Sequence, residues 1–540
     1  MGFKMVNHVL LIPGDGTGKE TVPEGVKTLD AVAGRLGLEF KYDTAIMGGD
    51  AYDRAVAGLS EPERKEIPTW DDEPKRSLGL PQETIDKMYR ARDNNGAILF
   101  GAVGRPDLPK RLAELGLLHM RHLFDAVNNR PFIIDPILAS QSSLLRESPI
   151  SIDGMAIRSP SESLYSGESG PIPDDTNPGW YTRKPFTRSK LEQFVKEVFL
   201  EAEETGKQLL CASKCNVLTS EELLSNVFAK YVQEFGNRVK LNTCFSSTGE
   251  VIIDAAGMHL AKTPQKFNNT IVIADAMFGD YLKWIADVVT SEVASKEVRQ
   301  RLKEEGLSRI ITRDLCGGLY FGEKGLSEDG AFNTMAYDRK TIRNLIEVAR
   351  RYGNRIGVDS IDTVVIPKIP AFDFVRTESE KYLAERGYDG KCMTGQEVVR
   401  AILTDPFSLR TAASTNMIGD LITDLAAAGM GSLGLPPSSE TNSDGFGNYQ
   451  PISGSAPDIA GKPLDSQNPG RGTLCNPIGQ IRSAAMMLED RGTQDGARMI
   501  YNAVNQVLRV ARTKDIWEPK YQLVSTQEMG SLIADRIRVV

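Results

Sequence analysis

The chain has 540 residues, of which 41% are hydrophobic and 25% are charged, and its formal net charge is −8. This length exceeds a single ordinary core, so we expect several domains of a soluble globular protein. The acidic balance argues against nucleic acid or an anionic membrane as the main partner, although a local arginine cluster can still bind an anionic substrate. Six cysteines without paired spacing and only four histidines argue against a disulfide framework and a zinc site, and favour a cytoplasmic protein.

The first hundred residues alternate between strand-like and helix-like patterns. The stretch "HVLLIPGDGTG" at 8–18 predicts a buried strand ending in a glycine-rich turn, and the residues after it have helical apolar spacing. "GAILFGAVG" at 96–104 predicts a second buried strand, and such alternation is typical of an α/β fold. A polar, proline-containing stretch at 58–81 is expected to be a surface insertion. The opening apolar run is too short for a signal peptide, and no apolar stretch is long enough to span a membrane.

An internal repeat follows residue 150. "IRSPSESLYSGESG" at 157–170 and "TRDLCGGLYFGEKG" at 312–325 share the order Arg, Tyr, Gly-Glu and Gly, with the arginines and tyrosines each 155 residues apart. Each copy continues to a strand with a lysine, and these two lysines, Lys214 and Lys368, are 154 residues apart. Each copy then reaches a related phrase, "ADAMFGDYLKWIAD" at 274–287 and "STNMIGDLITDLAA" at 414–427. The nearly constant offset predicts a duplicated segment.

The remainder of the chain is rich in glycine and then in helical patterns. "AAAGMGSLGLPPSSE" at 426–440 and "GSAPDIAGK" at 454–462 indicate loops, whereas 476–490 and 496–512 have the apolar spacing of two amphipathic helices.

These phrases together resemble the isocitrate/isopropylmalate dehydrogenase family of β-decarboxylating dehydrogenases. Single phrases are weakly specific, but the ordered set spans nearly the whole chain. It comprises the two Arg–Tyr–Gly loops and "IPGDGTGKE" at 12–20, "GAVGRP" at 101–106, "GLLHMR" at 116–121, "NNRP" at 128–131, "SKCNV" at 213–217, "DAAGMHL" at 254–260, "NMIGDLITD" at 416–424, "GSLGLPPS" at 431–438, "GSAPDIAGK" at 454–462 and "NPIGQIRSAAMML" at 476–488.

The resemblance implies an α/β fold with a large domain built from both chain ends. The family's shorter subunit has one small domain and works as a dimer, in which each active site takes a lysine and an aspartate from the partner. Here the resemblance implies two tandem copies of the small α/β domain, an in-chain pseudo-dimer. The expected boundaries are 1–110 and 416–540 for the two parts of the large domain, 111–300 for the first small copy and 301–415 for the second.

The two copies differ where the family keeps its catalytic groups. The first copy has Lys214 and Asp254, the residues that the family borrows from a partner, but Trp284 stands where an acid is expected. The second copy has Asp420 and Asp424, four residues apart and therefore on one face of a helix, but Gln396 stands at the borrowed-aspartate position. We interpret this as one complete site divided between the copies.

The resemblance assigns chemistry to these residues. Asp254, Asp420 and Asp424 would hold Mg²⁺ or Mn²⁺, hard ions that prefer oxygen ligands. Lys214, with a pKa lowered by the metal, would take the proton of the substrate hydroxyl, and Tyr320 would protonate the enol carbon. Arg111, Arg121 and Arg313 would bind the substrate carboxylates. Arg158 and Tyr165 match the same loop and are the alternative to Arg313 and Tyr320.

The cofactor is expected to be NAD. Asp458 stands where the family's NAD-dependent members keep an acid for the adenosine ribose, and an acid repels the 2′-phosphate of NADP. Ser453 replaces a histidine usual in the family, and an insertion separates Lys462 from Asn476. The implied cofactor-binding residues are Gly454, Ser455, Ala456, Pro457, Asp458 and Asn476.

The implied function is metal-dependent, NAD-linked oxidative decarboxylation of a 2-hydroxy diacid. The loop with Leu117 and Leu118 favours a 3-substituted malate of the isopropylmalate type, with isocitrate, homoisocitrate and tartrate-like acids as alternatives. A non-catalytic regulatory subunit and a dehydrogenase without decarboxylation are the competing functions. The pseudo-dimer predicts a monomer that binds a small hydroxy diacid, with a homodimer as the alternative.

Overall fold

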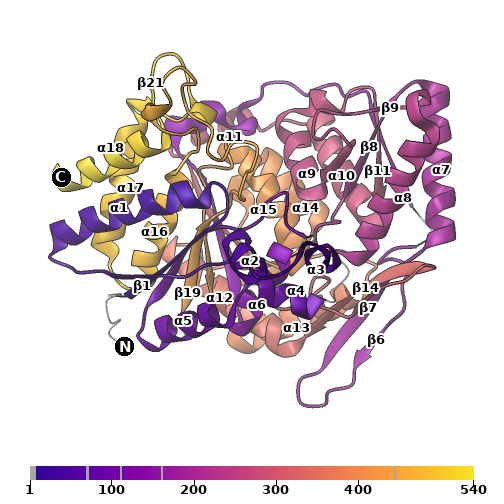
Figure 1. The fold of residues 1–540 in the computed structure, drawn as a ribbon, viewed down its shortest axis with the longest axis horizontal. Coiled ribbons are helices and arrows are strands. Elements are labelled where there is room, and N and C mark those ends of the chain that lie inside the picture. Colours follow the sequence, from indigo (N-terminus) through magenta and orange to yellow (C-terminus); the bar gives the residue numbers. More distant parts are fainter. Residues whose placement is uncertain (1–7, 68–71, 110–111, 160–161, 443–444, 540) are drawn as a thin grey trace. The chain divides into compact units, whose positions relative to one another are not determined.

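A computed structural model describes residues 8–67, 72–109, 112–159, 162–442 and 445–539 (Figure 1). The chain separates into two compact units. Unit 1 comprises Met1–Gln141 and Met430–Val540, and unit 2 comprises Ser142–Gly429. Both chain ends, indigo and yellow in Figure 1, therefore belong to unit 1. No helix in the described ranges is both long enough and apolar enough to cross a membrane.

Unit 1 contains a mixed sheet with strand order β4-β18-β19-β3-β1-β2. The pairs β1–β2, β1–β3 and β19–β3 are parallel, whereas β18 pairs antiparallel with both β4 and β19. The predicted strands at 8–14 and 97–102 are confirmed, and their nearly continuous burial is typical of parallel strands. The strands are β1 (His8–Gly14), β2 (Lys41–Thr44), β3 (Ala97–Ala102), β4 (Val127–Ile134), β18 (Pro437–Thr441), β19 (Gly447–Pro451), and a small parallel pair, β20 (Ala511–Arg512) and β21 (Gln522–Leu523).

Helices from both chain ends pack together in unit 1. Helix α1 packs against α16 and α18, and α16 against α17, so the two closing amphipathic helices expected from the sequence are confirmed. The polar stretch at 58–81 forms the short helices α3 and α4. The helices are α1 (Gly18–Leu36), α2 (Gly49–Val56), α3 (Glu61–Glu66), α4 (Asp72–Gly79), α5 (Gln82–Asp93), α6 (Leu112–Leu123), α16 (Ile478–Asp490), α17 (Gln494–Leu508) and α18 (Thr526–Val539).

Unit 2 contains two parallel sheets with the same arrangement of strands. The first has the order β10-β8-β11-β5, with the short β9 paired to β8, and the second has the order β16-β15-β17-β12. In both sheets the first strand in the chain, β5 or β12, lies at one end. The last strand, β11 or β17, lies beside it and pairs on its other side with β8 or β15. The strands are β5 (Gly154–Ser159), β8 (Gln208–Ser213), β9 (Lys240–Leu241), β10 (Glu250–Ile252), β11 (Thr270–Asp275), β12 (Leu307–Asp314), β15 (Ile361–Val365), β16 (Gly390–Thr394) and β17 (Thr411–Ser414).

The helices of unit 2 repeat in the same order between these strands. A long helix precedes the second strand of each sheet, and a Gly-Asp helix follows the last one. The helices are α7 (Arg188–Thr205), α8 (Thr219–Phe235), α9 (Ile253–Lys262) and α10 (Ala276–Ser291) in the first half, the connecting α11 (Lys296–Glu304), and α12 (Arg339–Arg355), α13 (Pro370–Arg386), α14 (Gly395–Thr404) and α15 (Asn416–Met430) in the second half.

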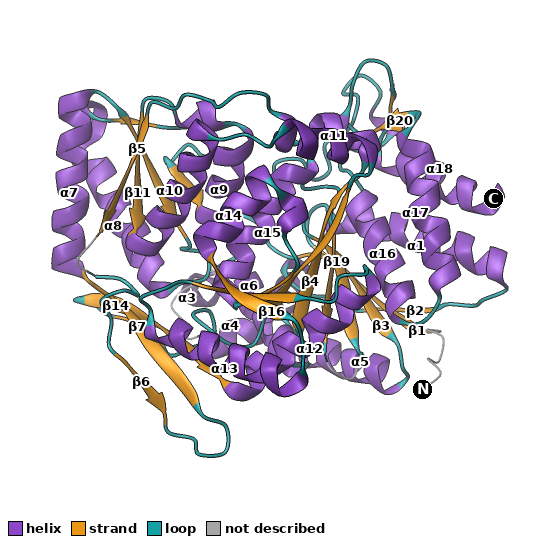
Figure 2. Cartoon of the chain, turned by 180° about the vertical axis from the view of Figure 1, so that it is seen from behind, coloured by secondary structure: helices purple, strands orange, loops and turns teal. Residues whose placement is uncertain are grey.

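An antiparallel sheet joins the two halves of unit 2. Its order is β13-β14-β7-β6, and the central strands pair along their whole length, from Gly179 opposite Asp338 to Thr187 opposite Gly330 (Figure 2). Each half contributes one long and one short strand, so the sheet forms only when both halves are present. The strands are β6 (Ser169–Ile172), β7 (Gly179–Thr187), β13 (Lys324–Leu326) and β14 (Gly330–Asp338).

Helices α10 and α15 also meet in unit 2. The hydroxyl of Tyr281 in α10 donates a hydrogen bond of 2.8 Å to the backbone carbonyl of Leu421 in α15. Helix α10 packs against α14, where a Cβ atom on Gly395 would lie 2.9 Å from the ring of Trp284. Each half is thus held to the other through helices as well as strands.

The boundaries of the units differ from those expected from the sequence. The divisions fall after residues 141 and 429, whereas the sequence suggested 110 and 415. The first difference places β4 in unit 1, where it pairs with β18. Helix α15 accounts for the second, because it follows β17 and contacts α10 within unit 2. The expected division of the small-domain region at residue 300 stays a prediction.

Candidate active site

Lys214 lies at the centre of a buried ion-pair cluster in unit 2. It follows the last residue of β8, Asp254 lies in the first turn of α9, and Asp420 lies in α15. The Lys214 ammonium contacts the Asp254 carboxylate and lies 2.9 Å from Oδ2 of Asp420. Carboxyl ends of parallel strands and the helices that follow them commonly bring functional side chains together in this way. A lysine and an acid from the first half therefore meet an acid from the second half.

Arg313 and Tyr320 complete the cluster around Asp420. The Arg313 guanidinium, at the end of β12, pairs with Oδ1 of Asp420 and donates a 2.7 Å hydrogen bond to Oδ1 of Asn416. The Tyr320 hydroxyl donates a 3.1 Å hydrogen bond to Oδ2 of Asp420. Gly419 is required here, because a Cβ atom at that position would lie 2.6 Å from Cγ of Arg313. The short Gly-Asp phrase thus lets the arginine lie against α15.

Burial dominates the electrostatics of the cluster. Lys214, Arg313 and Tyr320 are 2–4% exposed, and Asp254 is 7% exposed. Burial acts to lower the pKa of Lys214, but the Asp254 and Asp420 carboxylates outweigh it and hold that pKa well above its usual range. Burial raises the pKa of Asp254, and the Lys214 charge offsets part of the rise. The sequence argument expected a lowered lysine pKa because it assumed a bound metal; in the protein alone, the ammonium is itself the cation between the acids.

Asp424 lies one helical turn after Asp420, and its carboxylate belongs to the same acidic environment. Burial raises the pKa of the Tyr281 hydroxyl well above its usual range, and the charges of Asp254, Asp424 and Asp420 raise it further. All three predicted metal ligands are therefore close enough to act on this one hydroxyl. Among the residues that the structure describes, no three His, Cys, Asp or Glu side chains are already spaced to hold a metal ion.

The donor set nevertheless fits a hard divalent cation. The Oδ1 atom of Asp254 is buried without a hydrogen-bond partner, while its Oδ2 atom engages Lys214. The Lys214 ammonium already lies between Asp254 and Asp420, so this position accepts positive charge. Every candidate donor is a carboxylate oxygen, the ligand type of Mg²⁺ and Mn²⁺. Asp254, Asp420 and Asp424 are thus the residues of this chain suited to hold such an ion.

The first half carries a partial counterpart of this cluster. Arg158 pairs with Asp280 at 2.6 Å, and the Tyr165 hydroxyl donates a 3.1 Å hydrogen bond to the same carboxylate, as Arg313 and Tyr320 do with Asp420. The counterparts of Lys214 and of the acids are not gathered around Asp280 in this way. Lys368, the counterpart of Lys214, is exposed, and so is Gln396 at the expected acid position. The half-buried Trp284 stands one turn after Asp280, where the second half has Asp424. Arg158 and Tyr165, the sequence-based alternatives, thus lie on Asp280 and not on Asp420.

The predicted substrate arginines of unit 1 have different surroundings. The Arg121 guanidinium, in α6, forms a buried ion pair with Glu440, 2.6 Å from Oε1. Glu440 also accepts hydrogen bonds from the side-chain amides of Asn448 and Gln450. Arg111 lies outside the described residues. Sequence reasoning missed the Glu440 partner, because nothing in the spacing of 319 residues between them indicates contact.

The predicted cofactor segment of unit 1 lies beside the glycine-rich turn after β1. The Thr17 amide donates a 2.9 Å hydrogen bond to the Ser455 carbonyl, and the Thr17 hydroxyl donates to the Gly454 carbonyl. Ala456 has a positive φ of 40°, which turns the backbone sharply before the exposed Pro457 and Asp458.

Asn476 lies in the same unit but is already engaged. Its amide nitrogen donates a 2.9 Å hydrogen bond to Oδ2 of Asp515, and its oxygen accepts one from the Ile478 backbone. Asp458 is thus exposed, whereas the Asn476 side chain is committed to Asp515 and the start of α16.

Three residues of unit 2 that the sequence argument did not single out support the cluster. Asn416 receives two hydrogen bonds from Arg313, and Tyr281 lies among the acids. Glu221 accepts a 3.4 Å hydrogen bond from the Lys214 backbone and forms a buried ion pair with Lys184. Asn416 was within reach of sequence reasoning, because it precedes Asp420 by one turn at the start of the same helix. The role of Tyr281 depends on contact between the two halves and has no local signal.

Comparisons with known proteins agree with this architecture. The family model for isocitrate/isopropylmalate dehydrogenase matches the chain twice, over residues 72–295 and 283–533. A 3-isopropylmalate dehydrogenase of Thermotoga maritima is 33% identical over 264 residues, which cover 47% of this chain and 69% of the relative. A 3-isopropylmalate dehydrogenase 2 of Dechloromonas aromatica is 26% identical over 98% of this chain and 99% of its own length. 

One solved structure is also similar over nearly the full length. The apo form of a β-decarboxylating dehydrogenase from Thermococcus kodakarensis is 18% identical, with a TM-score of 0.48, over 98% of this chain and 96% of that one. Because the family model covers most of the chain, the protein belongs to the isocitrate/isopropylmalate dehydrogenase family, whose members are NAD(P)-dependent β-decarboxylating dehydrogenases.

Proposed function

We propose that the protein is a metal-dependent, NAD-linked dehydrogenase that oxidatively decarboxylates a 3-substituted malate of the isopropylmalate or isocitrate type. The observation that carries this proposal is the buried cluster in which Lys214 and Asp254 meet Asp420, Arg313 and Tyr320. These are the residue types that the reaction needs: a proton acceptor, a proton donor, a carboxylate-binding group and acids for a metal.

We also propose that unit 2 is a duplicated small domain, so that the chain is a pseudo-dimer with one working site. Three observations support this: the two parallel sheets share one strand order, the two Arg–Tyr–Asp contacts have the same pattern, and the family model matches twice. The working site then draws Lys214 and Asp254 from one half, and Asp420 and Asp424 from the other.

The metal site of the proposal consists of Asp254, Asp420 and Asp424. A bound Mg²⁺ or Mn²⁺ would supply positive charge that acidifies the substrate hydroxyl and stabilises negative charge as CO₂ departs. The chain's own contribution is to hold three carboxylates in a buried setting, where their charges are poorly screened by water.

The proton transfers are assigned to Lys214 and Tyr320. Lys214 Nζ would accept the substrate hydroxyl proton once a stronger cation shares the Asp254 and Asp420 charges that now stabilise the ammonium. The Tyr320 hydroxyl, whose pKa burial keeps well above its usual range, stays protonated at neutral pH and can donate to carbon. Arg313 would hold one substrate carboxylate through its forked donors.

Arg121 and Arg111 remain the proposed partners of the other substrate carboxylate. Arg121 is held by Glu440, so a substrate carboxylate must share or replace that partner. Leu117 is half-buried and packs against the core of unit 1. Its side chain therefore has less surface to offer an apolar substituent of the malate than a solvent-exposed leucine would have.

The cofactor of the proposal is NAD, bound by residues 454–458. The exposed carboxylate of Asp458 would accept hydrogen bonds from free ribose hydroxyls and would repel a ribose phosphate. Asn476 would take part only through its backbone or after releasing Asp515.

The test is NADH formation at 340 nm with Mn²⁺ and a panel of 2-hydroxy diacids, with released CO₂ measured in parallel. We expect NADH and CO₂ in equal amounts with at least one 3-substituted malate, and much weaker activity with NADP. NADH without CO₂ would indicate a simple dehydrogenase. Absence of turnover together with tight binding to a second dehydrogenase chain would favour a regulatory subunit.

The pseudo-dimer is tested by light scattering of the purified full chain. A monomer is expected, because both small-domain copies already pair through β7 and β14 within one chain. A homodimer would reopen the question of which chain supplies Lys214 to each site.

A further inference from the structure

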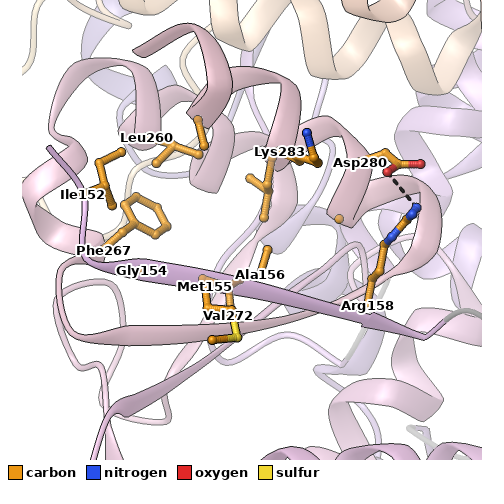
Figure 3. A pocket seen from close by; sticks show the side chains of 13 residues that line it. Ile152, Gly154, Met155, Ala156, Arg158, Leu260, Phe267, Val272, Asp280 and Lys283 are labelled. Atoms are coloured by element: carbon orange, nitrogen blue, oxygen red, sulfur yellow. Dashed lines mark ion pairs between the residues drawn. The ribbon is translucent and has the colours of Figure 1, made fainter. Parts of the chain in front are cut away.

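A pocket of about 310 Å³ lies beside β5, at the end of the first parallel sheet of unit 2 (Figure 3). Its walls come from β5, β11, and the helices α9 and α10 with the turn between them. Ligand pockets of proteins commonly have volumes of about 300 to 1,000 Å³, so this one suits a small molecule. None of its lining residues belongs to the Lys214 cluster.

One end of the pocket is apolar and firmly built. Leu260, Phe267 and Val272 line it and are 3–5% exposed. The Phe267 ring packs on the ring of Phe245, with centroids 5.2 Å apart, which fixes its position. Figure 3 shows Phe267, Leu260 and Ile152 grouped at this end, away from the charged side chains. The apolar end therefore offers a preformed surface for a hydrocarbon group.

The other end carries two cations and one anion, Arg158, Lys283 and Asp280 (Figure 3). Both Asp280 oxygens are engaged, Oδ1 by Arg158 and Oδ2 by the Tyr165 hydroxyl. The Arg158 side chain is 47% exposed, and the ion pair uses only its Nη1 atom. Lys283 pairs with Asp287, which does not line the pocket. The charged end therefore has a net positive lining and guanidinium donors open to a ligand.

Arg158 is held at this place by the backbone of α10. A Cβ atom on Gly279 would lie 2.9 Å from the Arg158 Cβ, so only glycine lets the arginine stem lie so close to the helix. The same relation holds between Gly419 and Arg313, but Arg313 is 2% exposed. The first half therefore has an arginine packed on a glycine in the same way as Arg313, but solvent can reach its guanidinium.

We propose that this pocket binds a short-chain carboxylic acid with a branched or aromatic tail. The tail would lie on Phe267, Leu260 and Val272, and the carboxylate would accept charge-assisted hydrogen bonds from Arg158. A metal-chelating hydroxy diacid is a poorer fit, since Trp284 stands where the second half has Asp424 and Lys368 is exposed elsewhere. The site is separate from the proposed reaction and does not depend on it.

The experiment is a ligand-observed NMR titration of the full chain with 4-methylpentanoate and its neutral amide, 4-methylpentanamide. We expect saturable binding of the acid, and we expect the amide to bind at least about tenfold more weakly than the acid. A charge-assisted hydrogen bond contributes roughly 1.5–3 kcal/mol, and the amide cannot form one. Arg158→Gln should weaken the acid by a similar factor. Ala156→Trp, at an exposed position of β5 that lines the pocket, should abolish saturable binding by filling it.

Arg376→Gln is the matched control. Arg376 in α13 has a side chain 46% exposed and pairs with an aspartate, as Arg158 does, but it does not line the pocket. Its replacement should leave the titration unchanged, and thermal melts should show that all three variants are folded. Absence of saturable binding to the wild type would overturn the proposal, and so would binding that survives both Arg158→Gln and Ala156→Trp. Neither outcome bears on turnover, which is measured separately.

Discussion

The two halves of unit 2 share one strand order but not one chemistry. In the second half, Asp420 receives Arg313, Tyr320 and the Lys214 ammonium of the first half, all of them buried. In the first half, Asp280 receives Arg158 and Tyr165 only, and Arg158 is half exposed. A single lysine and a second acid thus distinguish the candidate catalytic centre from the Arg158–Tyr165–Asp280 contact of the first half. The comparison shows that the two halves share the Arg–Tyr–Asp contact, whereas the buried charge cluster, which costs free energy unless its charges are paired, lies only around Asp420.

The largest difference is expected when each of the two lysines is replaced in turn by alanine. Lys214→Ala should lower turnover by about 10²- to 10⁴-fold, the range typical of a lost general base. Lys368→Ala should leave turnover nearly unchanged, because Lys368 is exposed, whereas Lys214 is buried among acids. Steady-state NADH formation measures both, and equal losses would remove the distinction between the halves. Because Lys214→Ala removes the ammonium that pairs with Asp254 and Asp420 and leaves Arg313 beside Asp420, a thermal melt must accompany it.

The two tyrosines give the next contrast. Tyr320→Phe should lower turnover by about 10²-fold, since a positioned proton donor contributes at least this much. Tyr165→Phe removes the same hydroxyl from Asp280 and should have little effect on the rate. The hydroxyl is the only group deleted in each variant, and each hydroxyl donates to an aspartate, so the pair is matched in size and in the contact that is lost. A larger loss in Tyr165→Phe would transfer the working role to the first-half loop.

A smaller effect, on stability, is expected from Trp284. Its ring packs beside Gly395 of α14, so Trp284→Ala should lower the free energy of unfolding by about 2 kcal/mol through the cavity it leaves. Trp517→Ala is the control, because Trp517 is 36% exposed and should matter less. Chemical denaturation followed by circular dichroism measures both. Equal stability of the two variants would show that Trp284 does not join the halves.

A pH dependence of stability is also expected, and it comes from the second half. Burial raises the pKa of Asp314, at the end of β12, from 3.8 to about 6. Below 3.8 the group is protonated in the folded and unfolded states alike, and above 6 it is ionised in both while buried in the folded one. The free energy of unfolding should therefore fall as pH rises through this window.

Asp314→Asn should remove that decline, because the amide does not ionise. The first half has Ser159 at the corresponding sequence position, so no equivalent titration is expected there. Denaturation of wild type and variant at several pH values between 4 and 7 checks this, and parallel pH profiles for the two proteins would contradict it.

Several parts of the fold and of the candidate site could be predicted from the sequence. The repeat singled out Lys214, Arg313 and Tyr320. The resemblance to the family added Asp254 and Asp420, and the structure brings these five side chains into one cluster. Their assigned roles stay proposals. The glycine-rich turn and the closing helices also followed from local pattern, because glycine conformations and apolar periodicity are written in neighbouring residues.

Contacts between distant segments were beyond that reasoning. The Glu440 partner of Arg121, the Asp515 partner of Asn476 and the placement of Tyr281 against Leu421 each join residues far apart in the chain. Long-range partners of polar side chains depend on how the elements pack, and apolar periodicity gives only which face is buried.

The most direct test of the divided site is the stoichiometry of Mn²⁺ binding, measured by electron paramagnetic resonance of the free ion. The account predicts one bound Mn²⁺ per chain in the wild type and in Asp280→Asn, and loss of that ion in both Asp254→Asn and Asp420→Asn. Two bound ions per wild-type chain, or an ion lost in Asp280→Asn and retained in Asp254→Asn, would contradict a single site shared between the halves.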